Sequence, residues 1–347
     1  MLQLLEQVYE GKSLNFEQAI TSFDQVLKGK VELPLVAAML AALKTKGETV
    51  EEIAGAAQAL RDQAVEFPKV DYSISDCCGT GGDGFKTINV STLSAFVAAS
   101  MGVKVVKHGN RSVSSKCGSS DLMSALGIET QLSPEQSKIL LEKTNFCFLF
   151  APNYHHGVKH VMPIRQSLKT RTIFNLIGPL ANPAQPDVQL LGVYDKQYCK
   201  PFAEILKLLG VKKALVVNGS GLDEIAIHDN THAVLLDHGK IETLEITPNA
   251  LGIASYSLSD IQVDKLEDNV QAGLALLKGN APQAHIDMVA ANTGALLFLN
   301  NYADTIEQGL IMAKQKILTG EVFEYMQNVK ELCKQLIRND AKELINA

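Results

Sequence analysis

The spacing of hydrophobic and polar residues changes near residue 70. Before that point, apolar residues recur every three or four positions, as they do on one face of an amphipathic helix. Phe16, Ile20 and Phe23 form such a face, and Asn15 with Gln18 resembles a capping box at its start. Capping signals predict two further helices over residues 34–47 and 49–61. The first 70 residues therefore indicate a small helical domain, which we expect to carry oligomer contacts.

After residue 70, short apolar runs of strand length alternate with stretches of helical period. The runs expected to form strands are residues 74–77, 103–107, 146–150, 189–193 and 214–218. Residues 233–237 and 241–246, joined through His238 and Gly239, indicate a hairpin. Residues 265–347 are expected to be largely helical. Alternation of this kind predicts an α/β fold with a mainly parallel, partly antiparallel mixed sheet flanked by helices.

Composition narrows the class of protein without naming a function. The 347 residues are 46% hydrophobic and 20% charged, which is typical of a globular protein large enough for two domains. A net charge of -6 argues against general nucleic-acid binding. No signal peptide or membrane span is apparent, so we expect a cytoplasmic protein without membrane or nucleic-acid partners. The six cysteines lack metal-site spacing and are expected to be buried thiols.

The stretch from Asp76 to Thr92 holds four glycines between a predicted strand and a predicted helix. Glycines allow backbone N–H groups to converge on an anion, and a helix N-terminus adds free N–H groups and a positive dipole end. A tight turn without a ligand is the alternative. Asp83, Asn89 and Ser91 supply more polar groups than a turn requires, and therefore favour a phosphate site.

Two more polar loops follow predicted strands. Residues 107–115 combine two cations with a glycine and several hydrogen-bond donors, which suits phosphate oxygens. Residues 219–224 end in Asp223 and Glu224, and neighbouring carboxylates facing phosphates are a common way to hold Mg²⁺. Because ligands collect at the carboxyl ends of parallel strands, these loops are expected to meet.

A fourth polar segment covers residues 153–183. His155, Lys159 and His160 have a spacing compatible with metal binding, but no carboxylate or cysteine completes the set. Arg165 is a candidate for a bidentate contact to a planar carboxylate. The residues thus indicate diphosphate chemistry with Mg²⁺, and they leave the second substrate open.

Together these motifs resemble the anthranilate phosphoribosyltransferase family. The matching stretches are Gly79-Thr-Gly-Gly-Asp83, Asn89-Val-Ser-Thr92, residues 107–115, residues 171–183, Gly221-Leu-Asp-Glu224 and Lys46-Gly-Glu-Thr49. The resemblance implies transfer of the phosphoribosyl group of phosphoribosyl diphosphate (PRPP) to the amine of anthranilate, in tryptophan biosynthesis. It also implies a homodimer, Mg²⁺ with two ions per subunit, a helical domain of residues 1–70 joined by helices near 165–182, and an α/β domain of residues 71–347.

The resemblance also assigns residues to each ligand. Those expected at PRPP are Gly79, Gly82, Asp83, Thr87, Asn89, Val90, Ser91, Thr92, Lys107, His108, Gly109, Asn110, Arg111, Ser112, Val113, Ser114, Ser115 and Ser119. Those expected at anthranilate are Gly79, Asn110, Arg165, His108 and Pro179, and those at Mg²⁺ are Ser91, Asp223 and Glu224. Lys107 is expected to stabilise the leaving diphosphate, and no residue is assigned as an acid or a base.

Two departures from the family pattern lie near the expected aromatic channel. His156 stands where a proline is common, and Lys169 where a glycine is common. Two alternative functions remain in view. One is a pyrimidine nucleoside phosphorylase, which has a similar glycine loop, and the other is an inactive relative that binds nucleic acid.

Overall fold

The computed structural model describes residues 1–111, 118–254, 256–263 and 265–346, with side chains up to residue 338. Four helices form the N-terminal part of the chain: α1 (Leu2–Tyr9), α2 (Phe16–Leu27), α3 (Leu33–Lys46) and α4 (Val50–Asp62). Capping boxes at Asn15 and Thr49 start α2 and α4, as the sequence predicts. Helix α1, with two turns and no side-chain cap, was not expected.

Seven strands form one sheet in the order β3-β2-β1-β4-β5-β6-β7. Their bounds are β1 (Ser75–Gly79), β2 (Val105–Gly109), β3 (Phe146–Phe150), β4 (Val188–Gly192), β5 (Lys213–Asn218), β6 (Thr231–Asp237) and β7 (Lys240–Ile246). The first five strands in that order are parallel, and β6 and β7 add an antiparallel edge. The predicted mixed sheet is confirmed, with boundaries shifted by one or two residues.

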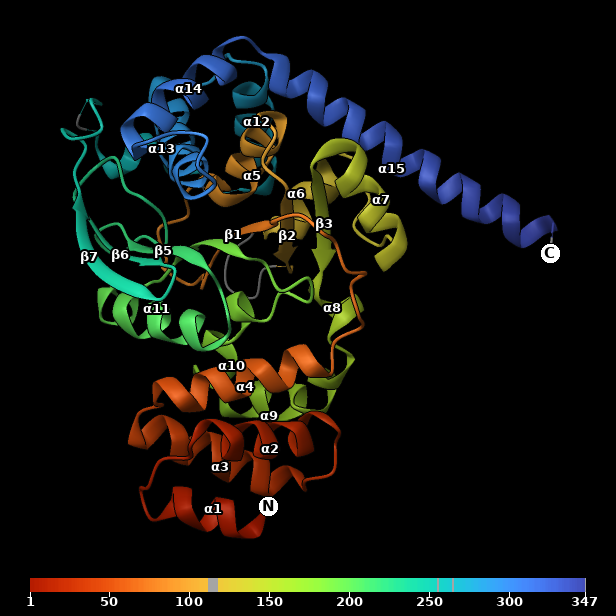
Figure 1. The fold of residues 1–347 in the computed structure, drawn as a ribbon, viewed down its shortest axis with the longest axis vertical. Coiled ribbons are helices and arrows are strands. Elements are labelled where there is room, and N and C mark those ends of the chain that lie inside the picture. The colour runs from red at the N-terminus through yellow and green to blue at the C-terminus, as the bar shows by residue number, and fades with distance from the viewer. Residues whose placement is uncertain (112–117, 255, 264, 347) are drawn as a thin grey trace.

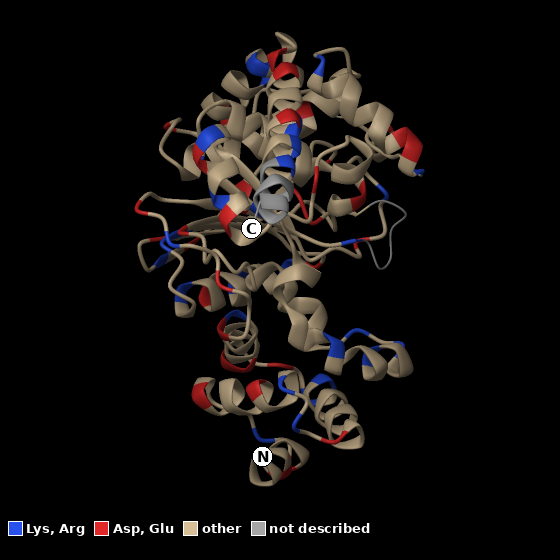
Figure 2. Cartoon of the chain, turned by 90° about the vertical axis from the view of Figure 1, so that its right-hand side faces the viewer, with Lys and Arg blue, Asp and Glu red and all other residues tan. Residues whose placement is uncertain are grey.

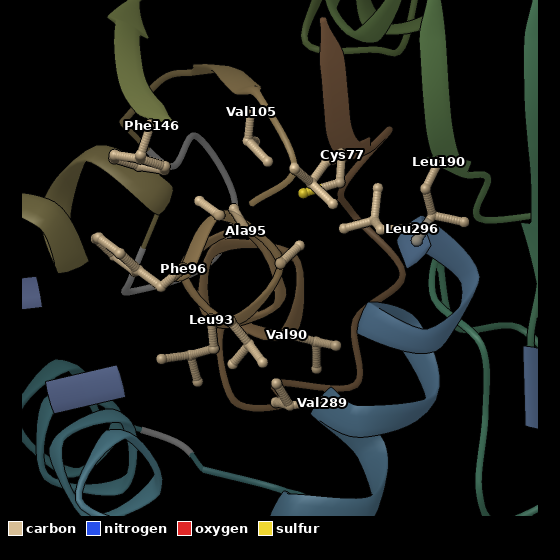
Figure 3. Close-up of a cluster of buried hydrophobic side chains, with 14 of the residues drawn as sticks. Cys77, Val90, Leu93, Ala95, Phe96, Val105, Phe146, Leu190, Val289 and Leu296 are labelled. Atoms are coloured by element: carbon tan, nitrogen blue, oxygen red, sulfur yellow. The ribbon is translucent and has the colours of Figure 1, made fainter. Parts of the chain in front are cut away.

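Helices cover both faces of the sheet (Figure 1). Their bounds are α5 (Val90–Ser100), α6 (Ser119–Ala125), α7 (Pro134–Thr144), α11 (Cys199–Leu208), α12 (Leu266–Leu277), α13 (Gln283–Leu299), α14 (Ile306–Leu318) and α15 (Glu321–Asn346). On one face, α5 presents Leu93 and Phe96 to the core beside Val289 of α13 (Figure 3). Phe96 stacks on Phe146 of β3 with ring centroids 4.6 Å apart. Helix α11 lies on the other face.

The connection between β3 and β4 returns to the helical domain. It contains α8 (Ala151–Tyr154), η1 (His156–His160), α9 (Met162–Leu168), α10 (Ile173–Leu176) and η2 (Gly178–Leu180). Two shorter 3₁₀ turns, η3 (Lys196–Tyr198) and η4 (Leu258–Asp260), complete the described elements. Helices α9 and α10 pack against α3, and Figure 1 shows them beside α2, α3 and α4.

The hydrophobic core of the helical domain does not end at residue 70. One buried cluster joins α1–α4 and α10 to α11 and the adjacent face of the sheet. Arg61 of α4 strengthens this junction from within, since its Nε donates to the carbonyl of Leu180 (2.6 Å) and its Nη1 to that of Leu209 (3.3 Å). Arg61 is only 5% exposed. The two domains therefore share a packed and hydrogen-bonded boundary.

Charged residues are mixed over both domains. Lys and Arg segments lie among Asp and Glu segments along the described chain (Figure 2). None of the described helices combines the length and the apolar character that spanning a bilayer requires. The five described cysteines, at positions 77, 78, 147, 199 and 333, are free thiols, and four of them are buried. Burial raises the pKa of Cys77 to about 12, which suits a packing role.

Candidate active site

The predicted polar loops meet at the point in the sheet where the order of the strands reverses. The chain runs from β1 outward through β2 to β3, and then returns to place β4 on the other side of β1. Loops leaving the carboxyl ends of β1 and β4 separate at such a point and leave room for a ligand. The glycine loop follows β1, the segment ending in Glu224 follows β5, and both lie at this edge of the sheet.

Asp223 is held directly against the glycine loop. The N–H of Gly81 donates to its Oδ2 at 2.6 Å. A Cβ on Gly79 would lie only 2.2 Å from the same oxygen, so no larger residue fits there without displacing Asp223. The absence of a side chain at Gly79 thus has a steric reason that the sequence alone did not reveal.

Gly192, at the end of β4, plays a similar part that sequence reasoning missed. A Cβ on Gly192 would lie 1.5 Å from the carbonyl oxygen of Asp223. The available signal was a glycine that ends an otherwise apolar strand, which often marks a close backbone approach. Gly79 and Gly192 together allow the backbone of residue 223 to lie on the ends of β1 and β4.

Glu224 lies at the N-terminus of α5. Its Oε1 accepts hydrogen bonds from the backbone N–H of Ser91 (3.2 Å) and from the Ser91 hydroxyl (2.6 Å). A carboxylate at this position is stabilised by the free N–H groups and the positive end of the helix dipole. Ser91 and Glu224, both expected at Mg²⁺, are therefore direct neighbours.

Negative charge accumulates at this point. Burial raises the pKa of Asp223 above its ordinary value, and the negative charge of Asp83 raises it further. The pKa of Glu224 is also raised, mainly by burial and then by the negative charge of Asp223. Among the described residues, no three His, Cys, Asp or Glu side chains form a ready-made metal cage. Mg²⁺ typically takes one or two carboxylates together with substrate phosphates, so this donor set fits that ion.

Lys107 is a buried cation whose charge acts on Glu224. It lies in β2, is 2% exposed, and its Nζ donates to the carbonyl of Cys77 at 2.6 Å. Burial acts to lower the pKa of Lys107, but the neighbouring groups Cys77 and Asp76 outweigh it, and the pKa is raised. The side chain is therefore a fixed positive charge inside the site.

The second loop is described as far as Arg111 and again from residue 118. The Ser119 hydroxyl donates to the Asn110 carbonyl at 3.3 Å, and a Cβ on Gly109 would lie 2.3 Å from that hydroxyl. The guanidinium of Arg111 lies 5.8 Å from the ring centroid of Phe150. Ser119 begins α6 and Gly118 is its N-cap, so Ser119 does not serve as the cap. Ser112, Val113, Ser114 and Ser115 lie outside the described residues.

Four residues around the start of α5 differ in what they offer a phosphate. Asn89 is the N-cap of α5 but makes no side-chain cap bond. The carbonyl of Thr87 accepts from Asn269, and the Thr92 hydroxyl is buried without a hydrogen-bond partner. Val90 turns its side chain into the core and donates its N–H to Ile88 (2.7 Å; Figure 3). The side chain of Val90 therefore belongs to the core, and a contact of Val90 with PRPP would have to come from its backbone.

The residues expected at anthranilate come from both sides of the domain boundary. Arg165 of α9 is partly buried, and its guanidinium lies 5.8 Å from the ring centroid of Phe174. His108 follows Lys107 in β2 and packs edge-on against His155, with ring centroids 5.1 Å apart. Burial lowers the pKa of His108, so its ring is neutral near pH 7. Pro179 is buried in η2.

Arg171 lies within one of the matching motifs, and its sequence context indicates no separate role for it. One of its guanidinium nitrogens donates to the carbonyl of Gly82, and its Cζ lies 4.1 Å from the ring centroid of Tyr194. Arg171 therefore links the segment after α9 to the glycine loop. The sequence does not show that these two segments lie close together in space, so it could not predict this contact.

The structure explains one of the two departures from the family pattern. Lys169 ends α9 in the left-handed conformation, with φ of 48° and ψ of 32°. Glycine is the usual residue at such a helix end because it has no Cβ. The departure at Lys169 is thus a matter of backbone conformation. His156 begins η1, and nothing in the structure explains its presence in place of proline.

The helical domain and the α/β domain are each matched by a model of a glycosyl transferase family, and together they place the chain in that class. A family model described as the a/b domain of a glycosyl transferase family matches residues 71–323. A second, described as the helical bundle domain of a glycosyl transferase family, matches residues 2–64. An anthranilate phosphoribosyltransferase of Shewanella baltica (strain OS185) is 46% identical over 343 residues, covering 97% of this chain and 96% of its own.

Solved structures agree with these matches. The anthranilate phosphoribosyltransferase of Thermus thermophilus has a TM-score of 0.91 and 35% identity, covering 95% of this chain and 99% of its own. The Saccharomyces cerevisiae enzyme in complex with PRPP and Mg has a TM-score of 0.86 and 26% identity, over 96% and 98%. The same yeast enzyme in complex with 4-fluoroanthranilate has a TM-score of 0.85. The chain belongs to the anthranilate phosphoribosyltransferase family.

Proposed function

We infer that this protein transfers the 5-phosphoribosyl group of PRPP to the amine of anthranilate, giving N-(5-phosphoribosyl)anthranilate and diphosphate in tryptophan biosynthesis. One observation carries the inference: Asp223 and Glu224 are held against the glycine loop and the N-terminus of α5, at the carboxyl edge of the sheet. This arrangement suits a substrate whose diphosphate arrives with Mg²⁺. The yeast relative bound to PRPP and Mg supports the same assignment.

The chemistry requires charge stabilisation more than proton transfer. Departure of diphosphate leaves positive charge on the sugar and builds negative charge on the leaving group, as in glycoside cleavage. Mg²⁺, when bound, supplies positive charge beside the diphosphate. Lys107 adds a fixed buried cation, and N–H groups of the glycine loop would add to this stabilisation. Because the aromatic amine is neutral at pH 7, positioning can suffice without a strong general base.

The remaining residue assignments belong to this proposal. Gly82, Asp83, Asn89 and Asn110 are placed at PRPP, and Arg165 at the carboxylate of anthranilate. We propose two Mg²⁺ ions per subunit, a cytoplasmic location and a homodimer. Large apolar side chains exposed on α1 and α3 support a dimer contact there, since Leu2 is 72% and Leu33 44% exposed. Light scattering at twice the chain mass would support the dimer, and a monomer mass would refute it.

Loss of anthranilate fluorescence on mixing the protein with PRPP and Mg²⁺ tests the reaction. We expect consumption that requires both, with an Arg165→Ala variant raising the anthranilate KM by about 10- to 100-fold through loss of a charge-assisted contact. Arg338→Ala, an exposed arginine on α15, is the matched control and should leave KM unchanged. Phosphorolysis of thymidine or uridine without anthranilate consumption would instead support a pyrimidine nucleoside phosphorylase. Salt-sensitive DNA binding without turnover would support an inactive relative.

A further inference from the structure

Four polar side chains point from the sheet toward one short segment, residues 178–182, which contains Pro179. We name this segment the acceptor wall. Asp76 and Cys78 come from alternate positions of β1, so they share one face of the sheet. Gln189 of β4 pairs in register with Asp76 across the parallel ladder, and His108 of β2 lies on the other side. The face of a sheet that packs against a hydrophobic core ordinarily carries apolar residues at such positions.

Two of these side chains bind the acceptor wall at its two ends. Gln189 donates from Nε2 to the carbonyl of Pro179 at 2.7 Å. Asn182 donates from Nδ2 to Asp76 Oδ2 at 2.9 Å and to the Val106 carbonyl at 2.8 Å. Gln189, Asp76 and Asn182 are all 1% exposed or less. The wall is thus fixed to the sheet at residues 179 and 182 by buried hydrogen bonds.

Asp76 also contacts β2, the strand that carries His108. Its Oδ1 accepts from the backbone N–H of His108 at 3.3 Å. One buried carboxylate therefore contacts both the end of the wall and the backbone of His108. Pro179 and His108, two of the residues expected at anthranilate, share this support, and we take them to line the aromatic channel.

This arrangement does not maximise the stability of the folded protein. The Oε1 of Gln189 is buried and has no hydrogen-bond partner. An unpaired buried polar atom is costly, and an apolar side chain of similar volume would avoid that cost. A polar side chain kept at the expense of stability commonly has a functional reason.

We propose that Gln189 and Asp76 are positioning residues that set the width of the anthranilate channel by fixing the acceptor wall to the sheet. The proposal rests on the proposed function and deepens it, since it assigns the control of acceptor binding to residues that need not touch the acceptor. Among the described residues, the glycine loop after β1 and the segment ending in Glu224 make no hydrogen bond to these two side chains, and Asp76 contacts the PRPP set only at β2, through the backbone of His108 and the charge of Lys107. Acceptor binding should therefore respond to their loss more than donor binding.

The test compares steady-state kinetics and thermal unfolding of Gln189→Met with the unmodified protein. We expect the anthranilate KM to rise by about 3- to 10-fold, from the loss of one buried hydrogen bond, with the PRPP KM within about 2-fold. Thermal stability should change little, because removal of the unpaired oxygen opposes the loss of the donor to the Pro179 carbonyl. Asp76→Asn keeps the side-chain shape and tests the second anchor if the first variant folds poorly. The same rise in anthranilate KM is expected, and any change in the PRPP KM reports on Lys107, whose pKa the charge of Asp76 raises.

Gln136→Met is the matched control. Gln136 is also buried and donates to a backbone carbonyl, that of Leu336 (3.3 Å), but it lies in α7, outside the proposed site. It should lose stability without a selective change in anthranilate KM. An active parent protein with unchanged anthranilate KM in both Gln189→Met and Asp76→Asn would overturn the inference alone. A parent protein that does not consume anthranilate would overturn the proposed function and this inference with it.

Discussion

Substitution of Gly192 by alanine should disable the site through the backbone of Asp223. The added Cβ would lie 1.5 Å from the carbonyl oxygen of Asp223 and 2.2 Å from its carbonyl carbon. Both distances must lengthen to at least 3.0 Å, the limit below which real Cβ contacts are essentially absent. Because the obstacle is backbone, no side-chain rotation relieves it, and residue 223 must move by roughly 1 Å or more, a displacement of the size that disturbs catalytic geometry.

Such a shift has two measurable consequences. Forcing atoms into a packed site typically costs about 1–3 kcal/mol of unfolding free energy. A displacement of about 1 Å in catalytic machinery can cost roughly 100-fold in rate. Urea unfolding and the anthranilate fluorescence assay would measure these two quantities. We expect Gly192→Ala to lose at least about 1 kcal/mol of stability and about 100-fold in kcat/KM.

Gly273→Ala provides the matched control. Gly273 lies within α12, and a Cβ there would contact Leu93 at an ordinary 3.4 Å. Alanine in a helix gains about 0.5–1 kcal/mol over glycine, so this variant should be as stable as the parent or more so, with unchanged turnover. A Gly192→Ala variant with parental stability and turnover would refute the steric reasoning and the position of Asp223.

Three further outcomes follow from the fold. Lys169→Gly should raise the unfolding free energy by up to about 1 kcal/mol in urea, whereas Lys169→Val should lower it by about 1–2 kcal/mol, because β-branched residues disfavour the left-handed region. Arg61→Met should lose about 2–4 kcal/mol, since it leaves two backbone carbonyls at the domain boundary without their charged donor; calorimetry showing an unchanged Tm would contradict this. Burial lowers the pKa of His155 to about 4, below its unfolded value of about 6.5, so the unfolded chain binds more protons and stability is lost as pH falls between these values. Asp76, whose pKa burial raises to about 6, acts in the opposite direction, so the readout is the difference in slope between the parent and His155→Gln, and equal slopes would refute the assignment.

The local spacing of apolar and polar residues was sufficient to predict most of the helices and strands. Capping boxes at Asn15 and Thr49 and the apolar runs of the strands depend on neighbours in the chain, and the structure agrees with them. Helix α1 was missed because it is short and has no side-chain cap, so its formation depends on packing against α3. Strand ends moved by one or two residues because register is a property of the partner strand.

The site was predicted in composition but not in its contacts. Neighbouring polar loops at strand ends follow from the topology, which explains why Asp223 and the glycine loop meet. The close approach at Gly192 and the contact of Arg171 with Gly82 depend on distances between segments remote in sequence. Val90 is expected at PRPP because it stands within a motif; helical geometry turns its side chain toward the core, so the prediction stands for its backbone alone.

The two sides of the proposed acceptor site rest on different supports. Pro179 and His108 are fixed to the sheet through Gln189 and Asp76. Arg165, in contrast, lies on α9, which packs against α3 in the helical domain. The contact with the anthranilate carboxylate therefore depends on where the helical domain sits relative to the sheet, whereas the aromatic channel is fixed to the sheet as well as to α4, through the Arg61–Leu180 hydrogen bond. It follows that a change at the domain boundary should alter anthranilate binding directly through Arg165, and should reach the glycine loop only through Arg171, which donates to the Gly82 carbonyl.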